Sequence, residues 1–490
     1  MKRMYIPIKT VSISLLVIVL LINFSVPNLS QVKLDCKNFV SPYSKLEIEG
    51  YVRLKNKTVV MNQTVTVGEN SKFEIVNSTI DFRGISASTL ILNYGELVIR
   101  NSSIITDLNK NYSVVIASYG RLSIVNSKIS NVFLPVNFKN GSVTYVQAVS
   151  AKSGEVAIIG STFENYTIGI LIEAVTSPSI LNNTFIFCPF GVYLSSLNFK
   201  IDGNLFLNSL ATAITASGFN GNIVGNYILN DRDKLIETLR PFGDVTIGVD
   251  VSGINITIRE NIIGNTYKCI AASGLNHCII EGNRIFTNGS MQGEMQIEYT
   301  EYAVIRNNTI INQWDPIEIY NSRHLIIEYN VLIRGSGGIR CEKVDESYIK
   351  PKNVTIRGNV LLDAGFIKVS QAENVRVLNN LLNNSFIYAE QVKALLIHNN
   401  TIKEGTIIIE NSEDIQITNN YIKAPEGEDP IELNNCKDVA ERDNIIYGEE
   451  DNAEDTVPFP ESRIMYAMLI IATVIVVTLV AVLRKTGGRT

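Results

Sequence analysis

One short pattern, repeated along most of the chain, constrains the fold more than any other feature. Its four most regular copies read TIRGNVLL, VRVLNNLL, LLIHNNTI and IQITNNYI. The second Asn of each copy recurs every 20 or 21 residues, at Asn359, Asn380, Asn400 and Asn420. A period in this range is typical of a solenoid, in which each repeat packs only against its neighbours.

Within one copy the residues alternate as they do in a β-strand. Ile367 and Val369 flank Lys368, and another apolar pair flanks Arg376. Alternation at period two, carried by β-branched residues and interrupted by polar turns, predicts short strands. Three such strands per coil, stacked on those of the next coil, predict an all-β, right-handed, three-sheet parallel β-helix. We expect the turn at Asn380 to adopt the left-handed conformation and stacked Asn side chains to form an internal ladder.

The pattern extends over most of the sequence, which sets the expected domains. Further copies begin at Asn77, Asn101, Asn126, Gly160, Asn182, Gly203, Gly225, Glu260, Gly282, Asn307, Tyr329 and Asp443. We therefore predict β-helix repeats over 76–447. Residues 32–75 are less regular and are interpreted as an N-terminal cap and the first coils, because an uncapped solenoid would expose strand edges.

The two ends of the chain carry membrane signals. Residues 1–26 combine basic residues with a short apolar run, which is typical of a signal peptide; a retained N-terminal anchor is the alternative. Residues 464–483 form an apolar run long enough to cross a bilayer, and the basic tail 484–490 places the cytoplasm on that side. The acidic segment 448–462 is expected to be a disordered stalk. The sequence thus predicts a cell-surface protein whose C-terminal helix anchors external repeats.

Composition excludes some partners. With 43 Lys and Arg against 48 Asp and Glu, the net charge of −5 makes nucleic acid an improbable ligand. The six cysteines form no CxxC pair, so we expect neither a metal site nor a cofactor, and we expect Cys278 and Cys341 to point inward. The disulfide pairing is not deducible. The sequons best placed in loops, and so the candidate glycosylation sites, begin at Asn111, Asn140, Asn288 and Asn353.

We expect the functional residues to lie on one strand of each coil. Alignment by the Asn turn places the middle residues of successive strands in one outward column. Its polar members are Asp250, Gln296, Glu318, Arg340 and Lys368. Three longer connections, 130–147, 231–243 and 343–352, flank this strand, and long loops on a rigid scaffold are common places for function. A solvated surface without a ligand is the alternative.

The only tryptophan lies at the entry to the same strand. Trp314 stands in the segment QWDPIEIY, with Asp315, Glu318 and Tyr320 close by. An exposed aromatic ring beside carboxylates suits a sugar ring, with Trp314, Tyr320, Gln296, Glu318 and Arg340 as the candidate carbohydrate-binding residues. The alternative is that Trp314 only packs a loop.

These repeats resemble the parallel β-helix repeats of the pectin-lyase-like superfamily, in particular the carbohydrate-binding and sugar-hydrolase repeats shared with NosD-type periplasmic proteins. The resemblance covers about Val59 to Ile446 and implies a groove over the strand singled out above. The catalytic motifs of the polygalacturonase type (NTD, DD and GHG) are missing, as is a calcium-binding Asp cluster. A copper site of the NosD type is not favoured either, because His277 and His324 are expected two coils, about 9–10 Å, apart with Tyr302 between them.

These sequence features are compatible with three alternative functions. The first is a membrane-anchored extracellular protein that binds or presents a polysaccharide, or that serves as an adhesive or envelope element with envelope proteins as partners. The second is a polysaccharide lyase or glycoside hydrolase, with Asp250, Asp315 and Glu318 as candidate acid or base and Arg340 or Lys368 opposing substrate charge. The third, an accessory subunit, rests on the NosD-type resemblance alone.

Overall fold

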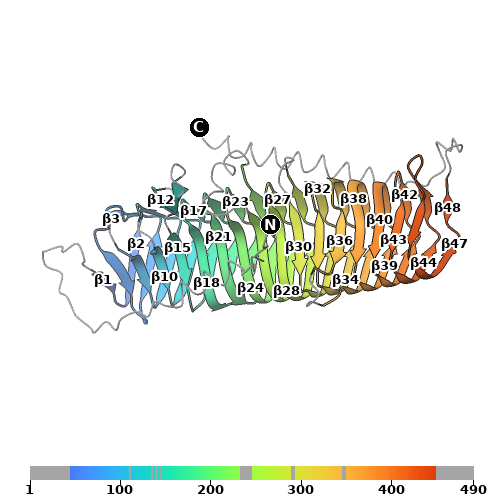
Figure 1. Cartoon of the computed structure of the whole chain (residues 1–490). Coiled ribbons are helices and arrows are strands. Elements are labelled where there is room, and N and C mark those ends of the chain that lie inside the picture. The colour runs from blue at the N-terminus through green and yellow to red at the C-terminus, as the bar shows by residue number, and fades with distance from the viewer. Residues whose placement is uncertain are drawn as a thin grey trace, which may run out of the picture. The chain divides into compact units, whose positions relative to one another are not determined.

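The computed structural model describes residues 45–447 apart from residue 86 and the segments 110–111, 134–135, 138–141, 144, 232–245, 288–292 and 345–348. Within this part of the chain every regular element is a β-strand, and coils stack on one another in chain order, from the blue strands to the red ones (Figure 1). No helix there is long and apolar enough to cross a membrane. The predicted segments 1–26, 448–462, 464–483 and 484–490 lie outside the described residues.

Each coil adds one strand to each of three parallel faces. The first face holds the strands that the sequence predicts to carry function. Its members are β1 (Lys45–Ile48), β4 (Thr64–Val67), β7 (Thr89–Asn93), β10 (Ser113–Ser118), β15 (Val146–Ala151), β18 (Ile168–Thr176), β21 (Phe190–Leu197), β24 (Thr212–Val224), β26 (Ile247–Arg259), β28 (Lys268–Glu281), β30 (Glu294–Glu298), β33 (Ile317–Tyr320), β36 (Ile339–Glu342), β38 (Val360–Ser370), β40 (Leu381–Glu390), β43 (Ile407–Glu410) and β46 (Ile431–Asn434).

The second face follows the first in each coil and ends at the Asn turn. It comprises β2 (Tyr51–Lys55), β5 (Lys72–Val76), β8 (Glu96–Arg100), β11 (Arg121–Val125), β16 (Val156–Ile159), β19 (Ser179–Leu181), β22 (Lys200–Asp202), the second halves of β24, β26 and β28, and then β31 (Glu301–Arg306), β34 (Arg323–Glu328), β37 (Lys352–Arg357), β39 (Glu373–Leu378), β41 (Lys393–His398), β44 (Glu413–Thr418) and β47 (Lys437–Arg442).

The third face follows the Asn turn. It comprises β3 (Thr58–Val60), β6 (Thr79–Asp81), β9 (Ser103–Thr106), β12 (Lys128–Asn131), β17 (Thr162–Glu164), β20 (Thr184–Ile186), β23 (Leu205–Leu207), β25 (Tyr227–Leu229), β27 (Ile262–Gly264), β29 (Arg284–Phe286), β32 (Thr309–Gln313), β35 (Val331–Gly335), the first residues of β38 and β40, and then β42 (Thr401–Lys403), β45 (Tyr421–Lys423) and β48 (Ile445–Ile446). A short antiparallel hairpin, β13 (Val136–Asn137) and β14 (Ser142–Val143), lies within the connection 130–147.

One continuous apolar core runs through the coils. On β44, Ile415 and Ile417 are buried and Gln416 between them is exposed, as strand alternation requires. The described cysteines other than Cys436 are also buried, among them Cys278 and Cys341, and the five described cysteines form no disulfide. Because each inward side chain packs on its equivalents in neighbouring coils, the core places the outward residues in register as well.

A continuous hydrogen-bonded ladder, predicted from the repeat, lines the turn between the second and third faces. In a representative rung, the Asn380 amide donates to the Asn400 side-chain oxygen at 2.9 Å and to the Ile356 carbonyl at 3.0 Å. The same Asn400 oxygen accepts the Asn380 backbone N–H at 2.9 Å. The rungs are Asn183, Asn204, Asn226, Asn261, Asn283, Asn308, Asn330, Asn359, Asn380, Asn400, Asn420 and Asn444. Serines take over in the earlier coils, where the Ser102 N–H donates to the Ser127 hydroxyl at 3.1 Å.

The expected conformation of this turn is wrong by one residue. The left-handed residue is Asn379, with φ of 54°, and not Asn380. The preceding position makes the bend and points outward, which allows the following Asn to turn its side chain into the core. This division explains why glycine fills the outward position in several coils, for example Gly358 with φ of 61°.

Candidate functional site

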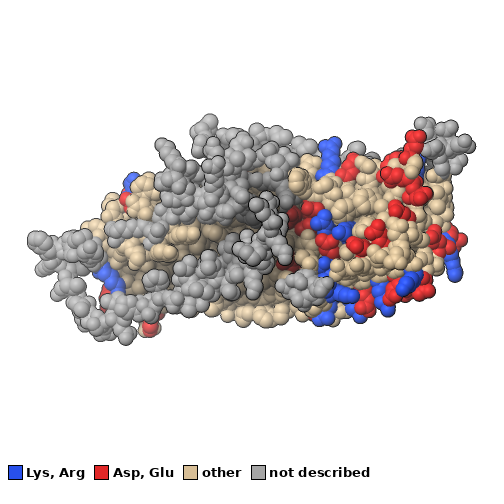
Figure 2. Space-filling view, viewed as in Figure 1, with Lys and Arg blue, Asp and Glu red and all other residues tan. Residues whose placement is uncertain are grey.

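The middle residues of six strands on the first face form one row. They pair from coil to coil in the order Asp250, Ala271, Gln296, Glu318, Arg340 and Lys368, on β26, β28, β30, β33, β36 and β38. We call these residues the charged row. Its register is the one that the sequence predicts. Neighbouring strands lie about 4.8 Å apart, so that side chains of adjacent members contact each other. Figure 2 shows basic and acidic side chains side by side over the coils that contain β36, β40 and β43.

The row is less exposed than the sequence predicts, because none of its polar members is fully open to solvent. Glu318 is only 5% exposed, whereas Gln296, Arg340 and Lys368 are half-buried. The longer side chain of Arg340 on the neighbouring strand contacts the glutamate at 3.1 Å. Its carboxyl group is therefore taken largely out of water, and this burial raises its pKa above the ordinary value for glutamate.

Arg340 is the residue on which the carboxylates converge. Its guanidinium lies 3.1 Å from the Glu318 carboxylate and 3.4 Å from that of Asp315. On its other side, the guanidinium lies 5.6 Å from the centroid of the Phe366 ring. Its Nε–H is buried without a hydrogen-bond partner among the described residues. Two acids and one ring therefore fix the orientation of this side chain.

Glu294 is a functional candidate that sequence reasoning missed. It is the first residue of β30, pairs in register with Lys268, and is 8% exposed. Burial is the main cause that raises the pKa of its carboxyl group to about 7; the charges of Glu318 and Asp315 contribute to the rise, while Lys268 and Arg340 oppose it. The sequence held the signal: in EMQIE, alternation places Glu294 and Gln296 on the same side of the strand.

At the other end of the row, Asp250 lies apart from the cluster around Arg340. Ala271 separates it from Gln296 in the register. Burial raises the pKa of Asp250 to about 6, and the charge of Lys268 counteracts part of that shift. The lysine amine donates to the side-chain oxygen of Gln296, whose amide in turn donates to Glu298. Lys268 thus connects Asp250 electrostatically with the acidic residues of β30.

The two aromatic residues of the candidate site, Trp314 and Tyr320, differ in their exposure to solvent. Trp314 lies in the connection from β32 to β33, where the residue is 58% exposed, so more than half of its surface is open to a ligand. Its carbonyl accepts a hydrogen bond from the Ser336 hydroxyl at 3.1 Å, which fixes the backbone beneath the indole. Tyr320 is half-buried beside Glu318, and burial together with the glutamate charge raises the pKa of its phenol.

Lys368 closes the row at the C-terminal side. Its amine lies 3.1 Å from the Glu342 carboxylate and 5.8 Å from the centroid of the Tyr388 ring. It does not contact the cluster of Asp315, Glu318 and Arg340 through any ion pair in the described part of the chain. Lys368 therefore belongs to the edge of the site.

The other predicted residues lie elsewhere. Asn353 lies within β37 and not in the expected loop; its φ is 55°, and its side-chain oxygen accepts a hydrogen bond from the Asn374 amide at 2.6 Å. Asn111, Asn140 and Asn288 lie outside the described residues. The rings of His277, Tyr302 and His324 stack with centroid separations of 4.9 and 4.7 Å, which places the two histidines in alternate coils, as the sequence predicts. Among described residues, no group of three or more His, Cys, Asp or Glu side chains could hold a metal ion.

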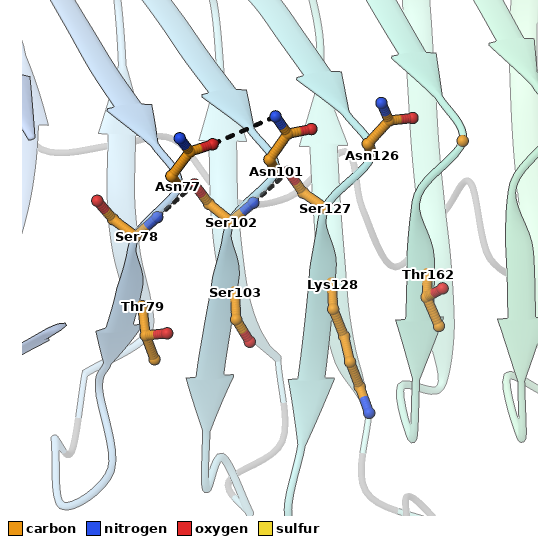
Figure 3. Close-up of a pocket in the computed structure, with 11 residues that line it drawn as sticks. Asn77, Ser78, Thr79, Asn101, Ser102, Ser103, Asn126, Ser127, Lys128 and Thr162 are labelled. Carbon is orange, nitrogen blue, oxygen red and sulfur yellow. Dashed lines mark hydrogen bonds between the residues drawn. The ribbon is translucent and has the colours of Figure 1, made fainter. Parts of the chain in front are cut away.

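A separate open pocket of about 550 Å³ lies at the Asn turn of the early coils. Figure 3 shows its lining, in which Asn77 and Asn101 are hydrogen-bonded to each other and the serines beside them bond the turn backbone. Lys128 at its edge is paired with Glu164 at 2.7 Å. The described residues of this lining include no aromatic side chain and no acidic residue, in contrast to the charged row with Trp314 beside it. The charged row is the stronger candidate.

Comparison with known proteins places the row within a recognised repeat region. Residues 246–392 match the family model described as the right-handed β-helix region. The protein is a right-handed parallel β-helix. The resemblance stated from the repeats is therefore confirmed for the fold, and the matched segment contains every member of the charged row.

Several solved structures show a distant likeness. The periplasmic alginate epimerase AlgG is 12% identical over 82% of this chain and 84% of that chain, with a TM-score of 0.27. The hyperthermoactive exopolygalacturonase from Thermotoga maritima is 12% identical over 62% of this chain and 84% of that one, with a TM-score of 0.33. The tailspike protein of E. coli bacteriophage HK620, solved with a pentasaccharide, is 10% identical over 77% and 73%, with a TM-score of 0.33. No curated protein sequence matches the chain.

Proposed function

We propose that this protein binds a polysaccharide over β30, β33 and β36. One observation carries the proposal: an exposed tryptophan stands beside charged side chains that are already ordered. Trp314 is 58% exposed, and next to it Arg340 is held between Asp315 and Glu318. A sugar ring presents an apolar face to an aromatic ring and hydroxyl groups to charged hydrogen-bonding partners, so this combination suits it.

The scaffold supports binding because it limits the entropy lost on association. The strands under the row are hydrogen-bonded to neighbours on both sides, and Arg340 is held by two carboxylates. A ligand therefore meets side chains that need little further ordering, which leaves more of the contact energy as affinity.

The test is a titration of full-length protein with a panel of polysaccharides, repeated with the double variant Glu318→Gln/Arg340→Ala. Both charges are removed together so that the buried Glu318 does not lose its cation while it is still charged; Asp315, which is more accessible, keeps its charge. We expect the tightest-binding polysaccharide to lose about tenfold or more in affinity, typical for removing central contacts of a binding site. The matched control is Glu328→Gln/Arg357→Ala, an ion pair at 2.6 Å on the second face, which should leave binding unchanged. Equal affinity of the first double variant and the wild type would refute the proposal.

A specific observation also favours a second candidate, a glycoside hydrolase or polysaccharide lyase. Glu294, with a pKa of about 7, provides a carboxyl group that holds or releases a proton near neutral pH, and burial raises the pKa of the neighbouring Glu318 above its ordinary value. Asp315 and Asp250 are the further acids of the site. Release of reducing ends or of unsaturated products from a bound polysaccharide would support this function, provided that Glu294→Gln abolishes the release.

We further propose that the repeats face the outside of the cell, anchored by 464–483, where envelope proteins are available as partners. The support is the apolar run followed by the basic tail 484–490. Protease added to intact cells should remove the repeats and leave a protected C-terminal fragment. A chain that is protected over its whole length would contradict this orientation.

A further inference from the structure

The charges around the row are unequal in number, and this bears on the kind of polysaccharide that fits. On the first-face segments of β26, β28, β30, β33, β36 and β38, together with Asp315 just before β33, six carboxyl groups accompany three cationic groups in the described part of the chain. The carboxyl groups are those of Asp250, Glu294, Glu298, Asp315, Glu318 and Glu342, and the cations are Lys268, Arg340 and Lys368.

Each of these cations already has a partner. Arg340 lies between Glu318 and Asp315 at 3.1 and 3.4 Å, and Lys368 lies 3.1 Å from Glu342. The Lys268 amine donates to the Gln296 side chain. A carboxylate arriving on a ligand would have to compete with acidic residues of the protein for Arg340 and Lys368, and with the Gln296 side chain for Lys268.

The acidic residues, in contrast, are not all neutralised. Glu294 is in no ion pair with a described cation, although it pairs in register with Lys268. Among the described residues, the Glu298 carboxylate accepts a hydrogen bond from the Gln296 amide and forms no ion pair. An ionised carboxylate accepts hydrogen bonds from hydroxyl groups, and a protonated one also donates. Such groups suit the hydroxyl groups of a sugar and oppose a second carboxylate.

We propose that the polysaccharide bound by the charged row is a neutral one, and that polymers of uronic acids are rejected by Glu294, Glu298 and the acids around Arg340. This inference rests on the proposed function, since it names the ligand class of the same site. Rejection does not require a steric clash, because like charges brought close together in a half-buried setting repel more strongly than they do in water.

The experiment compares two groups of probes on full-length protein at pH 8 and low salt. The neutral probes are glucan, mannan, galactan and xylan; the uronate probes are polygalacturonate and alginate. We expect the tightest binder to be neutral, with both uronates at least about tenfold weaker. A uronate as the tightest binder would overturn the inference and leave the proposed function intact. Failure of every probe to bind would end the proposed function and this inference together.

A second measurement tests whether repulsion between like charges causes the preference for neutral polysaccharides. Glu294→Gln removes one negative charge and keeps the side-chain shape. The ratio of the affinities for neutral and uronate probes should therefore fall about threefold or more. Glu328→Gln on the second face is the matched control, since it removes a similarly buried glutamate away from the row, and it should not change the ratio. The ratio should also fall at pH 5, where Glu294 and Asp250 are protonated, given their pKa values of about 7 and 6. A ratio that neither Glu294→Gln nor pH alters would contradict the electrostatic origin.

Discussion

At the scale of single residues, the charged row shows how a surface position acquires chemistry. Glu318 and Gln296 occupy equivalent places on neighbouring strands, yet only the glutamate is buried. The sequence predicts which residues share the row because strand alternation fixes their side of the sheet. It does not predict the burial of Glu318, which depends on how the long side chain of Arg340 folds over it. Glu294 could have been found by extending the same alternation by one step.

The first prediction concerns the pH dependence of stability through Glu294. Its pKa rises from 4.5 to about 7 on folding, so between these values the native state binds more protons than the unfolded state. Stability therefore falls as pH rises through this window. The Glu294→Gln variant lacks this pH dependence. We expect its free energy of unfolding to exceed that of the wild type by roughly 1–3 kcal/mol at pH 8 and to differ little at pH 4. Denaturant melts at both pH values measure it, and an equal difference at the two pH values would argue against a buried Glu294.

The second prediction concerns Trp314. Because the residue is 58% exposed, Trp314→Ala should weaken polysaccharide binding by roughly 1–3 kcal/mol while the thermal midpoint stays nearly unchanged. The matched control is Tyr329→Ala, another exposed aromatic residue in the same coil but at the Asn turn, which should not affect binding. Calorimetric titration of the three proteins decides the point. A large loss of stability with unchanged binding would instead mean that Trp314 has a packing role.

At the scale of the element, the sequence repeat predicts nearly all of the Asn ladder and of the three strand faces. Asn, Gly and Ser recur at fixed places in the turn. Asn or Gly at the outward position adopts the left-handed conformation that bends the chain, and Asn or Ser at the inward position forms hydrogen bonds with buried backbone groups. The sequence does not separate these two roles where both residues are Asn, as at Asn379 and Asn380. Only the backbone angles show that the first makes the bend.

The third prediction separates the two roles. Asn380→Ala leaves the Asn359 N–H and the Ile356 carbonyl without their partners in the core, and it should cost about 2–4 kcal/mol. Asn379→Gly places the residue with the least strain at the left-handed position, so stability should change by less than about 1 kcal/mol. Denaturant midpoints of both variants measure the difference. Equal costs would contradict the assignment of the bend to Asn379.

At the scale of the whole molecule, architecture is readable from sequence and activity is not. A period of 20 or 21 residues leaves few folds open, which is why the β-helix could be predicted. The site has no comparable signal, because it is assembled from single residues on successive coils, and a charge at an outward position is most often plain surface. The long connections around the row add to the difficulty, since most of 231–243 lies outside the described residues.

The fourth prediction tests the anchor at this scale. Deleting 464–490 should release the repeats into the medium if residues 1–26 are removed as a signal peptide, because the apolar run is then the one remaining membrane contact that the sequence predicts. Immunoblots of medium and membrane fractions measure it. A truncated protein that stays in the membrane fraction would show that 1–26 is a retained anchor.

The most direct measurement is a crystal structure of the protein with an oligosaccharide of its tightest-binding polysaccharide. We expect one sugar ring to stack on Trp314 and its hydroxyl groups to contact Glu294, Glu318 and Arg340, on the floor formed by β30, β33 and β36. An oligosaccharide bound away from these strands, for example in the pocket lined by Asn77 and Asn101, would contradict the assignment of binding to the charged row.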